Sequence, residues 1–84
     1  MENKLYSIKD DLAGAFMTPF IHNNDETAKR AIKTMLNMPG ENEIKANYKD
    51  KQLYYVGEFD DRKGEITKTE KKFICNFQDL KEGE

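Results

Sequence analysis

One aromatic side chain and a run of basic ones in the second half of the chain have the types and spacing of a nucleic-acid contact. Tyr54 falls in a segment of strong strand character, and the stretch 62–72 follows it. That stretch contains five cations and two acids: Arg62, Lys63, Lys68, Lys71 and Lys72 against Glu65 and Glu70. Its local charge is therefore +3, in a chain whose formal net charge is −2. Rings that stack on bases, beside cations that contact phosphates, are what single-stranded DNA binding requires.

The same residues have ordinary structural explanations, and both interpretations stay open at this point. Tyr54 fits a sheet residue packed against a neighbouring side chain, because strand alternation does not identify the buried face. The charges of 62–72 fit a solvated hairpin that discourages pairing at a sheet edge. Tyr6 is a second candidate for base stacking. Another basic cluster, which a solvent-exposed helix face explains, consists of Lys29, Arg30 and Lys33.

Residues for catalysis or metal binding are scarce. The chain has one histidine, His22, and one cysteine, Cys75, in distant segments, so no catalytic triad can be argued from the sequence. A lone histidine near Asp25 and Glu26 lacks the pattern of ordinary zinc sites. Cys75 lies in an apolar segment, which favours a small core residue over a nucleophile. We therefore expect a non-enzymatic protein with no catalytic residues, no metal site and no cofactor.

Length and composition restrict the possible classes further. Eighty-four residues, 36% of them charged and 11% aromatic, indicate one small folded domain. A net charge of −2 weighs against a strong, non-specific nucleic-acid binder. No apolar run approaches the ~20 residues of a membrane span, and a lone cysteine without a secretion signal suggests the cytoplasm. Domains this small bury only about 60% of their unfolded surface, so a homodimer is one expected source of stability.

Hydrophobic periodicity predicts the elements that must position these residues. A helix begins at Asn23 or Asn24, where an asparagine caps it and Glu26 fits a capping box, and it ends by Met38. The predicted strands are 4–10, 13–21, 52–59, 65–69 and, as a candidate fifth strand, 72–77. A polar loop is expected at 40–51 and a hairpin turn at 60–64.

Strand alternation also predicts which side chains share a face. One face of 52–59 carries Leu53, Tyr55, Gly57 and Phe59, and one side of the last strand carries Phe73, Cys75 and Phe77. The simplest burial of these stripes is an α+β fold. In it, an antiparallel sheet of four or five strands in β-β-α-β-β order has one helix packed on one face. We expect a single domain over 1–84, with a frayed tail at 78–84.

Two stretches of the chain together resemble a known family. The first reads Lys4-Leu-Tyr-Ser-Ile-Lys-Asp10, then Leu12-Ala-Gly-Ala-Phe-Met-Thr-Pro-Phe20, Asn24-Asp-Glu26 and Ala28-Lys-Arg30. The second reads Tyr48-Lys-Asp50, Leu53-Tyr-Tyr-Val-Gly-Glu-Phe-Asp-Asp61 and Gly64-Glu-Ile66. Their order and spacing over residues 4–66 resemble the small non-structural protein of gokushovirus-type microviruses, which are single-stranded-DNA bacteriophages.

This resemblance implies a viral protein that is made during infection, stays in the host bacterial cytoplasm and is not part of the capsid. It also implies a role in viral DNA replication, at the switch to single-stranded genome synthesis. No binding or catalytic residue is transferred from the family by position, and nothing is carried over to residues 67–84.

Two functions of different classes are consistent with these observations. The first is an accessory protein that assists viral DNA replication by binding single-stranded DNA through Tyr54 and the basic residues of 62–72. The second is a protein-binding adaptor that engages a host or viral replication protein without touching nucleic acid or a membrane. An exposed apolar patch on the sheet face opposite the helix would indicate the adaptor.

Overall fold

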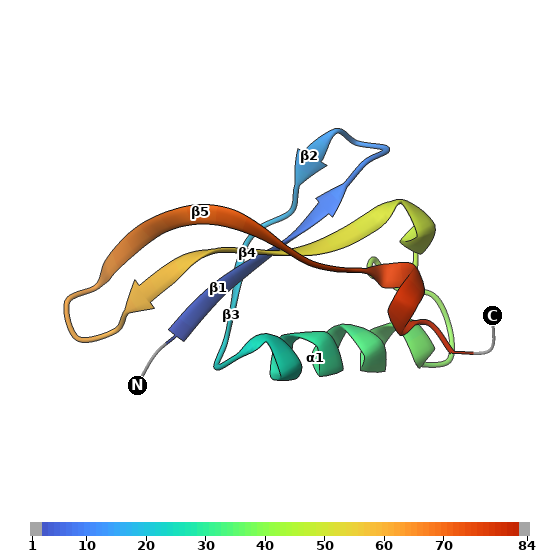
Figure 1. The fold of residues 1–84 in the computed structure, drawn as a ribbon. Coiled ribbons are helices and arrows are strands. Elements are labelled where there is room, and N and C mark those ends of the chain that lie inside the picture. The colour runs from blue at the N-terminus through green and yellow to red at the C-terminus, as the bar shows by residue number, and fades with distance from the viewer. Residues whose placement is uncertain (1–2, 83–84) are drawn as a thin grey trace.

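The computed structural model describes residues 3–82, in which one helix packs against one face of an antiparallel sheet (Figure 1). The strands are β1 (Asn3–Asp10), β2 (Ala15–Phe16), β3 (Phe20–His22), β4 (Lys51–Asp60) and β5 (Glu65–Asn76), and the helix is α1 (Asp25–Asn37). Two short 3₁₀ helices, η1 (Tyr48–Asp50) and η2 (Phe77–Leu80), precede β4 and follow β5. The predicted α+β class, with one helix on an antiparallel sheet, is confirmed.

Within residues 3–82, one face of the sheet carries no helix. Its strand order is β2-β1-β4-β5, and β3 pairs with β1 alongside β2. The hairpin of β4 and β5 extends well beyond the N-terminal end of α1 (Figure 1). We call the sheet face turned away from α1 the open face. Among residues 3–82, no helix is long and apolar enough to cross a membrane.

The predicted strand at 13–21 is wrong as a single element, because the chain there forms β2 and β3 with a break between them. Phe16 pairs with Lys9 and Phe20 with Tyr6, so the two registers differ by one residue. Pro19 lies in the break, and proline has no N–H to donate to a ladder.

The predicted strands 65–69 and 72–77 are one continuous strand, β5, with irregular pairing to β4. Leu53 pairs with Cys75 and Tyr54 with Phe73, so Ile74 is an extra residue that forms a bulge. A second shift follows, since Tyr55 pairs with Lys72 but Gly57 with Lys68. Bulges interrupt the alternation of side chains, which is why simple periodicity misassigned this strand.

The first bulge overturns the predicted common face of Phe73, Cys75 and Phe77. Cys75 packs against the core under α1, whereas Phe73 is 48% exposed and contacts Tyr54. Phe77 is not in the strand at all, because it begins η2 and is fully buried.

The core forms between α1 and the near face of the sheet. Tyr6 and Ile8 of β1, Leu53 of β4 and Phe77 of η2 are buried with the helix residues Ala28, Ile32 and Leu36. The Tyr6 hydroxyl donates to Asp25 Oδ1 at 2.6 Å, which joins β1 to the first turn of α1. Burial and this hydrogen bond to a carboxylate raise the pKa of Tyr6 above its ordinary value.

The cap of α1 lies one residue later than the predicted box. Asn24 Oδ1 accepts from the Thr27 N–H at 2.9 Å, and Thr27 Oγ1 accepts from the Asn24 N–H at 3.3 Å. Thr27 therefore takes the reciprocal position expected for Glu26, while Asp25 and Glu26 complement the positive end of the helix dipole.

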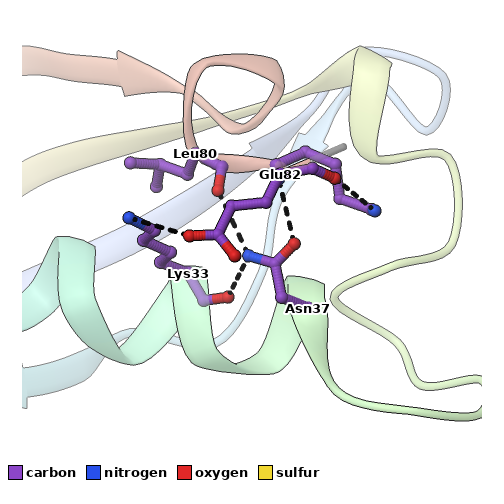
Figure 2. A network of polar contacts seen from close by, with 5 residues as sticks. Lys33, Asn37, Leu80 and Glu82 are labelled. Carbon is purple, nitrogen blue, oxygen red and sulfur yellow. Dashed lines mark hydrogen bonds and ion pairs between the residues drawn. The ribbon is translucent and has the colours of Figure 1, made fainter. Parts of the chain in front are cut away.

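The C-terminal segment is attached to the last turns of α1 by a polar network (Figure 2). Asn37 Nδ2 donates to the carbonyls of Lys33 and Leu80 at 2.8 and 3.3 Å, and its Oδ1 accepts from the Glu82 N–H at 2.9 Å. Lys33 Nζ lies 3.3 Å from a Glu82 carboxylate oxygen. The sequence predicts a frayed tail at 78–84, but the structure holds the chain against α1 as far as Glu82; residues 83–84 lie outside the described residues.

β5 passes close to β4 at Gly57. A Cβ added there would lie 2.7 Å from the backbone carbonyl oxygen of Thr67. We expect Gly57→Ala to lower the free energy of unfolding by about 1–3 kcal/mol, because backbone cannot move aside as a side chain can. Urea unfolding of the variant and of the wild type measures this difference in the free energy of unfolding. Gly40→Ala is the comparison, since a Cβ there meets open space and costs only its left-handed backbone, about 1 kcal/mol. Equal midpoints for Gly57→Ala and wild type would refute this packing.

The polar network in Figure 2 should contribute measurably to stability and should hold the C-terminal segment against α1. Asn37→Ala removes every polar contact between that side chain and the C-terminal segment, so stability should fall by about 1–3 kcal/mol. Amide hydrogen exchange of residues 77–82 should accelerate in the same variant. Lys33→Ala removes only the exposed ion pair and should cost less than about 1 kcal/mol. Unchanged exchange in Asn37→Ala would show that other contacts hold this segment.

Candidate nucleic-acid interface

Three aromatic rings from three different strands meet on the open face. The ring of Phe16, from β2, lies 5.4 Å from that of Tyr54, from β4, and Tyr54 lies 5.7 Å from Phe73, from β5 (centroid distances). The ring planes cross at 77° and 72°, so both contacts are edge-to-face. We call these residues, Phe16, Tyr54 and Phe73, the aromatic row.

The row depends on a small residue in the strand beneath it. β1 lies between β2 and β4, yet the rings of Phe16 and Tyr54 meet across it. The β1 residue opposite Tyr54 is Ser7, which is buried and whose hydroxyl donates to the Met17 carbonyl at 2.6 Å. Because Ser7 is small and its hydroxyl is satisfied in the sheet, the rings can close over it. A large side chain at this position would hold them apart.

The rings of the row stay partly open to solvent. Phe16 is 40% exposed and Phe73 48% exposed, while Tyr54 between them is half-buried. In edge-to-face contacts, one ring presents its edge to its neighbour, so part of its own face remains free. Part of the ring surface of the aromatic row is therefore accessible to a flat ligand.

Cations lie beside the row. Lys71 Nζ lies 5.4 Å from the centroid of the Phe16 ring, a cation–π contact that crosses the open face from β5 to β2. Lys9 pairs with Phe16 across the strands, but its ammonium also contacts Asp11 at 3.5 Å. Lys68 pairs with Gly57, which in turn pairs with Leu5, so the register places Lys68 on the open face.

The structure brings together only part of the predicted site. Tyr54 and Lys71 share the open face around Phe16, whereas Arg62 and Lys63 lie in the turn at the tip of the hairpin (Figure 1). The N–H groups of these two turn residues donate to Asp60 Oδ1 at 2.9 and 3.2 Å. The turn geometry therefore gives Asp60 a structural role beside the two cations.

Lys72 and Tyr6 are placed away from the open face. Lys72 is exposed but pairs with Tyr55, which packs against the core on the helix side. Tyr6 is fully buried, so it has no face to offer to a base. The predicted residues therefore do not form one continuous track along the hairpin.

Sequence reasoning missed Phe16 and Phe73. Both are aromatic residues in predicted strands, which was a usable signal. They lie beside Tyr54 because of the bulge at Ile74 and because the rings of Phe16 and Tyr54 meet over Ser7. Strand periodicity predicts neither feature.

The residues considered for catalysis and metal binding lie apart from the row. His22 packs its ring against Phe20 and Tyr6, with centroids 5.6 and 6.4 Å away. Burial raises the pKa of the Cys75 thiol to about 11, so the thiolate is a minor form at neutral pH. Within residues 3–82, no three or more histidine, cysteine, aspartate or glutamate side chains are grouped so that they could hold a metal ion.

Comparison with known proteins identifies one family. The phage ORF5 protein family matches residues 3–80, which is nearly the whole part of the chain that the structure describes. The match continues past residue 66, where the resemblance in the sequence ended, and covers β5 and η2. No curated protein and no solved structure matches the chain significantly. The chain is a member of the phage ORF5 protein family.

Proposed function

We propose that this phage protein is the small non-structural protein of a gokushovirus-type microvirus and binds single-stranded DNA through the aromatic row. In this role it assists viral DNA replication, or the switch to single-stranded genome synthesis, in the host bacterial cytoplasm. The observation that carries the proposal is the row itself: partly exposed rings side by side on a helix-free sheet face, with Lys71 beside them.

The geometry of the row suits unpaired bases. A base stacks on a free ring face whatever its identity, so binding of this kind tolerates sequence. Lys71 contacts Phe16 through a long, flexible side chain, and it can turn from the ring to a phosphate without disturbing the sheet. Lys68 supplies a second cation on the same face.

The charge distribution predicts how the binding depends on salt. Because Lys9 already contacts Asp11, Lys68 and Lys71 are the principal cations available to phosphates at the row. Two such contacts give a slope of roughly −1.4 for log K against log salt, since a single strand releases about 0.7 counterion per phosphate neutralised. Stacking rather than charge should therefore supply most of the affinity, consistent with a chain of net charge −2.

Leucine substitutions in the row test the proposal. Phe16→Leu and Phe73→Leu keep an apolar side chain but remove the ring, so each should weaken binding of a labelled oligothymidine by about 5- to 150-fold, at ~1–3 kcal/mol per stacked base. Fluorescence anisotropy at two salt concentrations measures the affinity and the slope.

Two further variants show whether the oligonucleotide binds at the aromatic row or at the hairpin. Ile66→Ala changes a side chain that is 70% exposed on the hairpin and should leave affinity unchanged. Joint charge reversal of Arg62, Lys63 and Lys68 should weaken binding only to the extent that Lys68 contributes. If the row variants bind like wild type while this reversal abolishes binding, the site lies on the hairpin instead.

The adaptor function has a specific observation in its favour as well. Phe16, Ile21 and Phe73 are exposed large apolar side chains on strands whose register places them on the open face. Such a patch also suits a protein partner. The same titration distinguishes the two functions, because an adaptor predicts no oligonucleotide binding at either salt concentration.

A further inference from the structure

A groove lies between α1, the break that separates β2 from β3, and the loop that follows α1. Its volume is about 680 Å³, and ligand sites in proteins span roughly 300–1,000 Å³. Its walls are mostly apolar and include Ile8, Met17, Phe20, Ile32, Met35 and Ile44. We propose that this groove holds a guanine base of the bound single strand, recognised by the carboxylate of Glu43. The inference rests on the proposed function, because it adds a base-reading position beside the aromatic row.

The wall that carries Glu43 is fixed to the rest of the fold. Lys51, which is buried at the start of β4, donates through Nζ to the Glu43 carbonyl oxygen. Asn42 Nδ2 donates to the Met35 carbonyl at 3.0 Å, and Asn42 Oδ1 accepts from the Lys45 N–H at 2.9 Å. The loop is therefore tied both to β4 and to α1, so the groove is formed before a ligand enters.

The polar groups of the groove have no hydrogen-bond partner of their own. Among the described residues that line it, Glu43 is the one acid, and none is lysine or arginine. Within residues 3–82, the Glu43 carboxylate makes no ion pair or hydrogen bond, and the side chains of Thr18 and His22 donate and accept none. A groove without a cation offers nothing to a phosphate. It favours a neutral ligand whose N–H groups can donate to the carboxylate.

Guanine fits a lone carboxylate better than the other bases do. Its N1–H and its 2-amino group lie side by side on one edge, so they can donate together to the two carboxylate oxygens. Adenine and cytosine each present an amino group beside a ring nitrogen that accepts, and thymine presents one N–H between two carbonyls. Parallel hydrogen bonds to a carboxylate are both strong and geometrically specific, and a bidentate pair discriminates against the wrong base.

The apolar walls suit the faces of a planar base, and one of them leads to the aromatic row. Phe20 offers a ring, while Met17 and Met35 offer flexible thioethers that contact aromatic systems favourably. Phe16 lines the groove and also supplies the β2 ring of the aromatic row. A strand that stacks one base on Phe16 can therefore place a neighbouring base in the groove, while its phosphates stay outside, near Lys71.

Mononucleotides test the groove apart from the aromatic row. In two-dimensional NMR of the full chain, dGMP should shift the methyl signals of Met17, Met35 and Ile44. Its dissociation constant should be about tenfold or more below those of dAMP and dTMP, as expected for a bidentate contact. The nucleotide dIMP lacks only the 2-amino group and should bind more weakly than dGMP. All four carry the same phosphate, so a phosphate contact alone cannot separate them.

Matched variants locate the contact. Glu43→Gln replaces the carboxylate by an amide of the same shape and should raise the dissociation constant of dGMP about tenfold, to that of dAMP. Glu41→Gln removes an exposed carboxylate that lies on the same loop outside the groove, so it should leave dGMP binding unchanged. Ala31→Leu fills the groove from α1 and should abolish the shift at Met17, whereas Thr34→Leu, on α1 but outside the groove, should not. Circular dichroism checks that every variant folds.

Equal dissociation constants for dGMP, dAMP and dTMP would overturn the proposal, as would a Glu43→Gln variant that binds dGMP like wild type. Shifts in the groove that N-acetylarginine amide produces and dGMP does not would also overturn it, because they identify a cation of a protein partner as the occupant. Oligothymidine contains no guanine, so its binding tests the aromatic row alone. Binding of oligothymidine without dGMP removes the groove and keeps the row, and the opposite result removes the row and keeps the groove.

Discussion

The register of β5 on β4 is the constraint on which the rest of the structure depends. At Ile74, one extra residue in β5 turns Cys75 toward α1 and leaves Phe73 on the other side of the sheet. Without that bulge, regular alternation would place both on one face, and Tyr54 would lose its neighbour from β5. The separation of core from open face therefore comes from an irregularity in the ladder rather than from composition.

A small chain with one helix must bury its apolar residues economically. Here the near face of the sheet is covered by α1 and by η2, whose Phe77 is fully buried and whose end is fixed to α1 through Asn37. No described element covers the open face in this way, and its rings pack against one another above Ser7 instead. Domains of this size have a thin margin of stability, so partly exposed rings on one face are a cost that a binding function explains.

The sequence predicts local elements better than it predicts how they pair. The start and end of α1 could be predicted because asparagine capping, acidic residues in the first turn and the following Pro39 are local signals. The break at Pro19 and the bulge at Ile74 depend on which strand lies alongside, so periodicity along one strand cannot locate them. For the candidate site, Tyr54 and Lys71 could be named from the sequence, but their neighbours Phe16 and Phe73 required the register of the strands.

The claim that the open face is the nucleic-acid contact can be tested by locating the contact itself. Oligothymidine carrying 5-iodouracil would be photo-crosslinked to the wild-type protein, and the attachment sites mapped by mass spectrometry. Binding at the open face predicts crosslinks at Phe16, Tyr54 and Phe73. Crosslinks confined to the hairpin turn at 61–64, or to the basic side of α1 at Lys29, Arg30 and Lys33, would contradict it.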